Sequence, residues 1–360
     1  MKILDRYLAG AVIIGALLTL GVLLPLMGFL LLADEMDEVG KHGYRFADAL
    51  LFVAMILPRY VYQVFPIVTL IGTLVGLGTL ASRSELVAMR AAGLSIGHIV
   101  YAALKGGTLL AVVAAAIGEG VAPIAEQQAL QWRSEARSGQ ATLLSKYGFW
   151  ARDGQAYVNI REIRSGADLR DIHIYEFDRT RRLRRVTHAR EASYVKGRET
   201  GKGSWVLREI SQSALSAERI TVSRLAQASW SSLLDPGLLK IVITKPQTLP
   251  IWGLWRYVRY MTANGQDARS YEVAFWGKVT HPFLILAMIF VSIPIVLASA
   301  RTSGLGLRIV SGILVGILFY LISRTFVYVA LLYDMSPLVA TLIPPFLFLA
   351  IAFRVLTRVG

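Results

Sequence analysis

The sequence predicts an α-helical membrane protein with six transmembrane helices and an inserted all-β domain of jellyroll-like type. Of its 360 residues, 55% are hydrophobic, and the mean hydropathy of +0.53 is too high for an ordinary soluble protein. The apolar residues gather in runs of about 20 or more, the length that a helix needs to cross a bilayer. Between residues 120 and 271 such runs give way to alternating polar and apolar residues, with 24 basic and 14 acidic side chains.

The first two membrane spans are expected near the N-terminus. Residues 7–33 carry no charge and are followed by acidic residues instead of a small-residue cleavage site, which predicts an uncleaved anchor. Pro58 and Arg59 interrupt the second apolar region. Because proline in a membrane helix usually marks a kink or a break, we expect residues 48–58 to be interfacial or re-entrant and residues 60–81 to cross.

The third span is expected at about residues 97–118. Lys105 lies within it, and its long side chain is expected to reach back to the nearer interface. The preceding span contains Gly72 and Gly76, a small-xxx-small pattern that lets another helix approach closely. We expect this pattern to serve packing within the chain.

The central region is expected to consist of short strands. Residues 149–160 are typical of two strands around an Asp-Gly turn. Further strands are expected at residues 171–177, 185–195, 204–210 and 218–225. An amphipathic helix rich in Trp and Tyr begins at Leu249, and these rings prefer the membrane interface.

Three more spans are expected at about residues 275–299, 307–329 and 335–353. The predicted organisation therefore has three parts. Spans one to three occupy residues 1–119, the β domain with its interfacial helix occupies 120–270, and spans four to six occupy 271–360.

Charges in the short loops predict the orientation. The basic residues that fall on one side are Lys2, Arg6, Arg83, Arg90, Arg301, Arg308, Arg354 and Arg358. The opposite short loops carry the acidic residues Asp34, Glu35, Asp37, Glu38 and Asp334. Short cytoplasmic loops are enriched in Lys and Arg. We therefore expect a bacterial inner-membrane protein with both termini in the cytoplasm and the β domain in the periplasm.

The charged island at residues 82–93, between the second and third spans, is the strongest functional signal. Ser82 and Glu85 have the spacing of a capping box, and Gly93 is suited to close a helix in the left-handed conformation. The face shared by its apolar and basic side chains comprises Leu86, Met89 and Arg90. We expect a short amphipathic helix at the cytoplasmic surface, either a connector or a handle for a soluble partner.

Several kinds of chemistry are not expected. The chain has no Cys, and its five His are scattered without metal-ligand spacing, so no metal site and no cofactor is predicted. The nearest match to a phosphate-binding loop, residues 197–204, has three instead of four residues between its glycines. The spans also lack the paired carboxylates or Ser/His pair of an intramembrane enzyme. The chain is therefore expected to be no enzyme, and ATP would be used by a partner.

The island and the residues before it resemble a known family. The likeness is carried by residues 70–81 and 84–93, with support from residues 5–7, 39–44 and 271–282. These stretches are similar to the lipopolysaccharide export permeases, the LptF/LptG family, and the likeness covers essentially the whole chain. The Ser-Glu-Leu-x-x-Met-Arg-Ala-Ala-Gly run at residues 84–93 is its specific part.

The resemblance implies a heterodimer with an LptF-type permease chain, driven by a cytoplasmic LptB-type ATPase dimer. An LptC-type single-span protein and a periplasmic LptA-type bridge are further implied partners, and no nucleic acid is. Lipopolysaccharide would leave the inner membrane laterally and pass through the β domain, with spans one and five as gates. The island would be the coupling helix that enters a groove on the ATPase. Its expected contacts are Glu85 first, with Arg83, Leu86, Met89 and Arg90 around it.

Candidate substrate contacts lie on the outer side. Lipopolysaccharide carries phosphates, which Arg binds bidentately and Lys binds as a point charge. The basic residues just outside the spans are Lys41, Arg45, Arg133 and Arg137, and Lys41 matches the family's basic residue after span one.

Aromatic and basic residues of the fifth span are a second group of candidates. Tyr320, Phe319 and Phe326 would line an acyl cavity if their face points inward. Arg324 is expected either to reach the outer interface or to contact substrate, and Asp334 or Tyr328 could pair with it.

Two other functions stay open on the residues alone. Another ATP-driven envelope exporter would share the topology but not the island sequence. A membrane receptor would use the β domain as a sensor, although the interior loops are too short for an output domain.

Overall fold

The computed structural model describes residues 2–41, 43–138, 143–154, 156–165, 168–178, 180, 182–195, 204–216, 219–230, 246–299, 305–333 and 335–359. The chain divides into two compact units. The helical unit comprises Met1–Arg137, Pro246–Trp255 and Arg269–Gly360, and the β unit comprises Ser138–Lys245 and Arg256–Ala268.

Six helical segments in the described part of the chain are long and apolar enough to cross a membrane, which confirms the predicted number. They are α1 (Lys2–Glu35), α2 (Phe46–Ser82), α4 (Ile96–Ala116) continued by η2 (Ile117–Val121) and α5 (Ala122–Ser138), α8 (Arg269–Ser299), α9 (Leu305–Leu332) and α10 (Pro337–Val359). The shorter helices are η1 (Met36–Glu38), α3 (Glu85–Ala91), η3 (Pro246–Thr248) and α7 (Ile251–Ala263).

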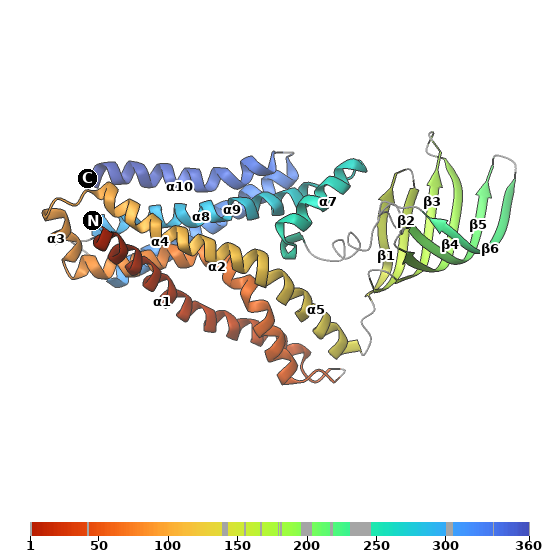
Figure 1. Ribbon diagram of the computed structural model, residues 1–360, viewed down its shortest axis with the longest axis horizontal. Helices are drawn as coiled ribbons and strands as arrows, with labels where there is room; N and C mark the ends of the chain where they lie inside the picture. The colour runs from red at the N-terminus through yellow and green to blue at the C-terminus, as the bar shows by residue number, and fades with distance from the viewer. Residues whose placement is uncertain are drawn as a thin grey trace. The chain divides into compact units, whose positions relative to one another are not determined.

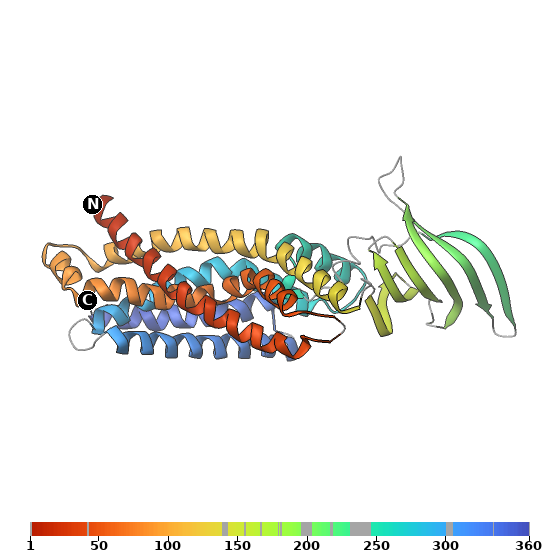
Figure 2. The same ribbon diagram turned by 90° about the horizontal axis from the view of Figure 1, so that it is seen from below.

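Both chain termini lie beside α3 at one end of the helical unit (Figures 1 and 2). We call this the α3 end, and the opposite end, to which α1 leads, the far end. The two termini and the α3 segment therefore share one end of the helical unit.

Helix α2 differs from the prediction, because it runs unbroken through Pro58 and Pro66. The expected break at residues 58–59 is therefore wrong. The Arg59 guanidinium forms an ion pair with the buried carboxylate of Glu126 in α5. A charge that would be costly alone inside an apolar helix is thus compensated by a partner 67 residues away.

The third span is also longer than predicted, since α4, η2 and α5 form one continuous rod past Glu119. The Glu119 carboxylate accepts a 2.7 Å bond from Lys278 of α8 and a 2.6 Å bond from the backbone N–H of Ile251. The second bond satisfies an N–H group at the start of α7 that has no partner within that helix. Paired in this way, Glu119 continues the helix instead of ending it.

Glycines bring α1 and α2 into backbone contact. A Cβ atom on Gly15 would overlap the carbonyl oxygen of Gly72, and one on Gly76 would overlap that of Ala11. The small-xxx-small pattern at Gly72 and Gly76 therefore packs within the chain, as predicted.

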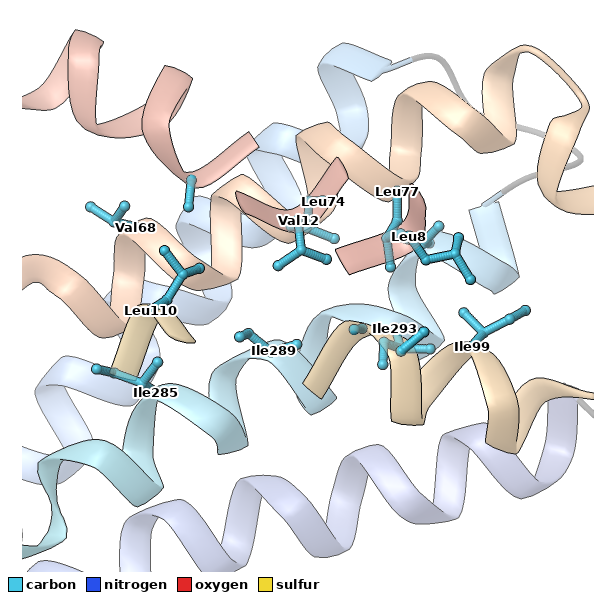
Figure 3. Packing of buried hydrophobic residues seen from close by; sticks show 14 of the residues in the cluster. Leu8, Val12, Val68, Leu74, Leu77, Ile99, Leu110, Ile285, Ile289 and Ile293 are labelled. Carbon is cyan, nitrogen blue, oxygen red and sulfur yellow. The ribbon is translucent and has the colours of Figure 1, made fainter. Parts of the chain in front are cut away.

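The main apolar cluster joins α1, α2, α4 and α8 (Figure 3). Leu8 and Val12 of α1 meet Leu74 and Leu77 of α2, and Ile289 approaches from α8. Leu86 of α3 belongs to the same cluster. The short helix is thus fixed to the helical core by an apolar side chain.

The described strands form one antiparallel sheet, in which every neighbour in space is also a neighbour in sequence. The strands are β1 (Leu143–Asp153), β2 (Ala156–Ser165), β3 (Asp168–Phe177), β4 (Leu183–Val195), β5 (Ser204–Leu215) and β6 (Ile220–Trp230). The inserted all-β domain is confirmed, and the turn between β1 and β2 contains Gly154 with a left-handed φ of 62°, as Asp-Gly predicts. These six strands form a meander.

The alternation of buried and less buried residues shifts by one position along one row of the sheet. Leu169 and Ile172 on β3 are both buried although they are three residues apart, and such residues in a regular strand point to opposite faces. Asp171 lies between them with a left-handed φ of 52°. Glu209 on β5 has a φ of 50°, and the strand registers place both opposite Arg190 of β4. These positions reverse the alternation in the middle of the sheet.

The aromatic helix expected from Leu249 corresponds to α7. Within the β unit, the Tyr260 hydroxyl donates a 2.8 Å bond to the carbonyl of Arg152, and Asn264 accepts a 3.2 Å bond from the Gly154 N–H. The second half of α7 is thereby attached to the hairpin of β1 and β2.

Candidate functional site

Helix α3 is built differently from the predicted capping box. The Ser82 hydroxyl donates a 2.8 Å bond to the carbonyl of Thr79 within α2, and it does not cap α3. The helix begins at Glu85, after Ser84 in the left-handed conformation with a φ of 60°. The capping-box prediction is therefore wrong, because α2 extends through Ser82 and uses its side chain. The predicted closure at Gly93 is confirmed by its φ of 92°.

Instead of capping α3, the Glu85 carboxylate contacts α1. It accepts a 2.6 Å hydrogen bond from the hydroxyl of Tyr7. Tyr7 lies two turns into α1, and its apolar neighbour Leu8 is part of the core that also holds Leu86. Of two adjacent residues of α3, Glu85 thus contacts the start of α1 by a polar bond and Leu86 joins the apolar cluster to which α1 also contributes.

The predicted coupling residues separate into an inner and an outer set. Leu86 is only 2% exposed, and Met89 packs partly against the same cluster. Arg83 and Arg90 are exposed, and Glu85 is intermediate between the two sets. The exposed side chains in and just before α3 thus include Arg83, Val87 and Arg90, with the Glu85 carboxylate at their edge, and Leu86 is a core residue.

A polar network beside α3 joins α1 to α4. The buried carboxylate of Asp5 contacts His98 Nε2 at 2.6 Å and Lys105 Nζ at 3.1 Å. The Lys105 side chain is half exposed and points towards the α3 end, and Asp5 is a partner that the sequence does not indicate. Tyr7 and Asp5 together give the start of α1 polar contacts with both α3 and α4.

The candidate substrate residues at the far end differ in exposure and in ion pairing. Lys41 has a 56% exposed side chain, with Glu38 at 3.9 Å, and Arg45 is exposed. Arg133 instead pairs at 2.8 Å with Glu35, which is 6% exposed, and its guanidinium covers the ring of Phe52 at 4.8 Å. Arg137 lies in α5, and its side chain is outside the described residues.

The candidates on α9 are also divided. Phe319 is buried against Phe348 of α10, with the ring centroids 5.1 Å apart. Tyr320 is exposed, and its hydroxyl accepts a 3.2 Å bond from Arg324 Nε. Tyr320, one turn before Arg324, is therefore the observed partner in place of Tyr328, and Asp334 lies outside the described residues.

Comparison with known proteins identifies the family. The family model described as "Lipopolysaccharide export system permease LptF/LptG" matches residues 6–358. The chain belongs to this family.

Individual members of the family are similar in sequence to this chain over almost its full length. It is 33% identical to the lipopolysaccharide export system permease protein LptG of Haemophilus influenzae, over 99% of this chain and 98% of that protein. It is 32% identical, with the same coverage of each chain, to LptG of Escherichia coli strain K12. Family membership confirms the resemblance seen in the sequence.

Sequence reasoning missed three residues of the α3 end, Asp5, Tyr7 and His98. Asp5 and Tyr7 belong to a stretch that supports the resemblance, but nothing in the local pattern indicates their partners. Those partners lie 78 residues away for Tyr7 and 93 and 100 residues away for Asp5. The one local signal is Asp5 itself, an acidic residue at the start of a strongly apolar helix.

Proposed function

We propose that this LptF/LptG permease is the LptG-type subunit of an ATP-driven lipopolysaccharide exporter. It would pair with an LptF-type permease chain and with a cytoplasmic LptB-type ATPase dimer, and would work with LptC-type and LptA-type components. The support is the near-complete coverage of relatives whose names state a role in lipopolysaccharide export. The α3 end would face the cytoplasm and the β unit the periplasm of the inner membrane, in line with the basic short loops.

Helix α3 is proposed to be the coupling helix that docks on the ATPase. The observation that carries this proposal is the asymmetry of α3, with Leu86 in the core and Arg83 and Arg90 exposed. A movement of the ATPase can be transmitted through such a helix, because its inner side is fixed to the membrane helices. Glu85, at the edge of the exposed side, is the proposed principal contact.

Tyr7 is proposed as a positioning residue that links coupling to gating. Its bond to Glu85 joins α3 to α1, one of the two helices that the family resemblance gives as gates. A displacement of α3 would therefore move the start of α1 first. The Asp5 network would fix α1 to α4 during that movement.

The proposed partner and gate surfaces coincide with the least buried spans. Only 11% of the most apolar segment of α1 and 17% of that of α9 are buried within the chain, against 67% for α2 and 61% for α8. The exposed apolar faces of α1 and α9 are thus free to meet the second permease chain or the acyl chains of the substrate.

Among the far-end residues, Lys41 and Arg45 are the proposed contacts for lipopolysaccharide phosphate. Both are exposed, whereas Arg133 is held by Glu35. An arginine already neutralised by a buried carboxylate has little charge to offer a phosphate. Tyr320 and Arg324, stacked on the exposed side of α9, are proposed to meet the substrate together.

Purification of the tagged chain from its own cells in a mild detergent tests this function. We expect a second permease chain, an ATPase dimer and bound lipopolysaccharide in the purified complex. An ATPase and second chain with a different cargo would favour another envelope exporter. A chain that purifies without any ATPase would contradict the proposed function and favour a receptor.

A further inference from the structure

Two histidines and one aspartate converge on the β sheet, and none of them is among the residues proposed for export. His188 Nε2 lies 2.7 Å and His173 Nε2 lies 3.1 Å from the same oxygen, Asp171 Oδ1. One ligand atom from each of the three side chains falls within 4.8 Å of the other two. The two imidazole rings stack with centroids 4.4 Å apart.

The fold, not the local sequence, creates this cluster. His173 on β3 and His188 on β4 are directly opposite in the antiparallel register, so their side chains are neighbours on one face. Asp171 lies two residues before His173, in the row where the alternation shifts, and its left-handed φ of 52° is rare for a residue with a side chain. The sequence shows no metal-ligand spacing because the third ligand comes from the next strand.

The three groups have the chemistry of a transition-metal site. Imidazole nitrogen and carboxylate oxygen are both zinc ligands, and three protein ligands with one open position are common in zinc sites. Zinc binds neutral imidazole and ionised carboxylate.

The Asp171 carboxylate also has a charged neighbour outside the cluster. Arg161 lies 3.5 Å from its second oxygen, Oδ2, which leaves Oδ1 to face the two imidazoles. Outer partners of this kind fix the ligands of metal sites.

The geometry leaves room for an ion and for water. Around a tetrahedral zinc ion with bonds of about 2.0–2.1 Å, ligand atoms are about 3.3 Å apart. The observed 2.7 and 3.1 Å separations from Asp171 Oδ1 would lengthen slightly to reach that spacing, and the ligand atoms of the two imidazoles already lie within 4.8 Å of each other. The side chains are 40% exposed for Asp171, 23% for His173 and 42% for His188, so solvent can supply the fourth ligand.

We propose that Asp171, His173 and His188 form a zinc-binding site that ties β3 to β4. The three ligand atoms and the open solvent side carry this inference. All three ligands lie in the β unit, and zinc binding can be measured without any assay of export. A bound ion would fix the middle of the sheet at the row where its alternation reverses.

The site is tested on the full chain in detergent, purified with a tag that contains no histidine. Cobalt titration followed by visible absorption, then displacement by zinc, measures affinity and coordination. The expected result is one ion per chain, with the cobalt bands of a four-coordinate site. Asp171→Asn and His188→Gln should each weaken binding at least tenfold, the loss that removal of an outer partner alone can cause.

Glu209→Gln is the matched control, because Glu209 lies in the same row with a φ of 50° and pairs with Arg190 at 3.0 Å. It should bind zinc as the unchanged chain does. Equal weakening by Glu209→Gln and Asp171→Asn would overturn the site in favour of a general effect on the sheet. Absence of stoichiometric cobalt or zinc binding to the unchanged chain would overturn it without reference to any variant.

Discussion

The hydroxyl of Tyr7 donates a 2.6 Å hydrogen bond to the carboxylate of Glu85, 78 residues further along the chain. The bond joins the start of α1 to the first residue of α3. In this family member it connects the proposed ATPase contact with a proposed gate helix. Glu85 has two lone-pair-bearing oxygens, so one can hold Tyr7 while the other faces a partner.

Tyr7→Phe removes only the hydroxyl and should uncouple α3 from α1. We expect lipopolysaccharide export to fall several-fold while the ATPase still co-purifies, because the exposed surface of α3 is unchanged. The measurement is transport in proteoliposomes alongside ATP hydrolysis. Tyr333→Phe, at an exposed tyrosine that directly follows α9, is the control and should leave both unchanged. Full export by Tyr7→Phe would show that the bond has no part in coupling.

Asp5→Asn should destabilise the α3 end, because it leaves Lys105 and His98 without their acidic partner. A lower melting temperature in detergent is expected. Replacing both charges, in Asp5→Asn with Lys105→Met, should recover part of the loss, since no unpaired charge remains. If the fall in melting temperature of the double variant equals the sum of the falls in the two single variants, Asp5 and Lys105 do not stabilise each other.

Gly76→Val should disrupt the crossing of α1 and α2. The new side chain would overlap the carbonyl oxygen of Ala11, and overpacking of this kind costs about 1–3 kcal/mol. The measurement is the free energy of unfolding in detergent. Gly21→Ala on α1 is the matched control, because nothing lies within 4 Å of its added Cβ. Similar losses in both variants would contradict close packing at Gly76.

The six spans could be predicted from the sequence because the length and hydropathy of a helix are local properties. Their ends could not, since Arg59 and Glu119 look like terminators until Glu126 and Lys278 are seen beside them. Burial of a charge depends on a partner from another helix, and no local pattern gives that partner. The same reason explains the missed role of Tyr7 and the wrong capping box.

The far-end candidates illustrate the same limit of local patterns. Lys41 and Arg133 look equivalent in the sequence as basic residues beside a span. In the structure Arg133 is engaged by buried Glu35 and Lys41 is half exposed. Only the three-dimensional partners separate a stabilising residue from a candidate contact.

Lys41→Gln and Arg133→Met should therefore have different effects. Arg133→Met leaves Glu35 buried without its partner and should cost on the order of 3 kcal/mol in stability. Lys41→Gln should leave the melting temperature unchanged but weaken lipopolysaccharide binding. A photocrosslinker at position 41 should capture lipopolysaccharide more strongly than one at position 133. Capture only at the α3 end would contradict the proposed far-end contact.

The most direct test of the central claim is charge reversal at Glu85. Export of lipopolysaccharide and co-purification of the ATPase are measured in a Glu85→Lys strain, with Glu38→Lys at the far end as the control. Our account predicts that Glu85→Lys loses export together with ATPase association or with the coupling of ATP hydrolysis to export, while Glu38→Lys retains ATPase association. Normal lipopolysaccharide export in the Glu85→Lys strain would contradict it.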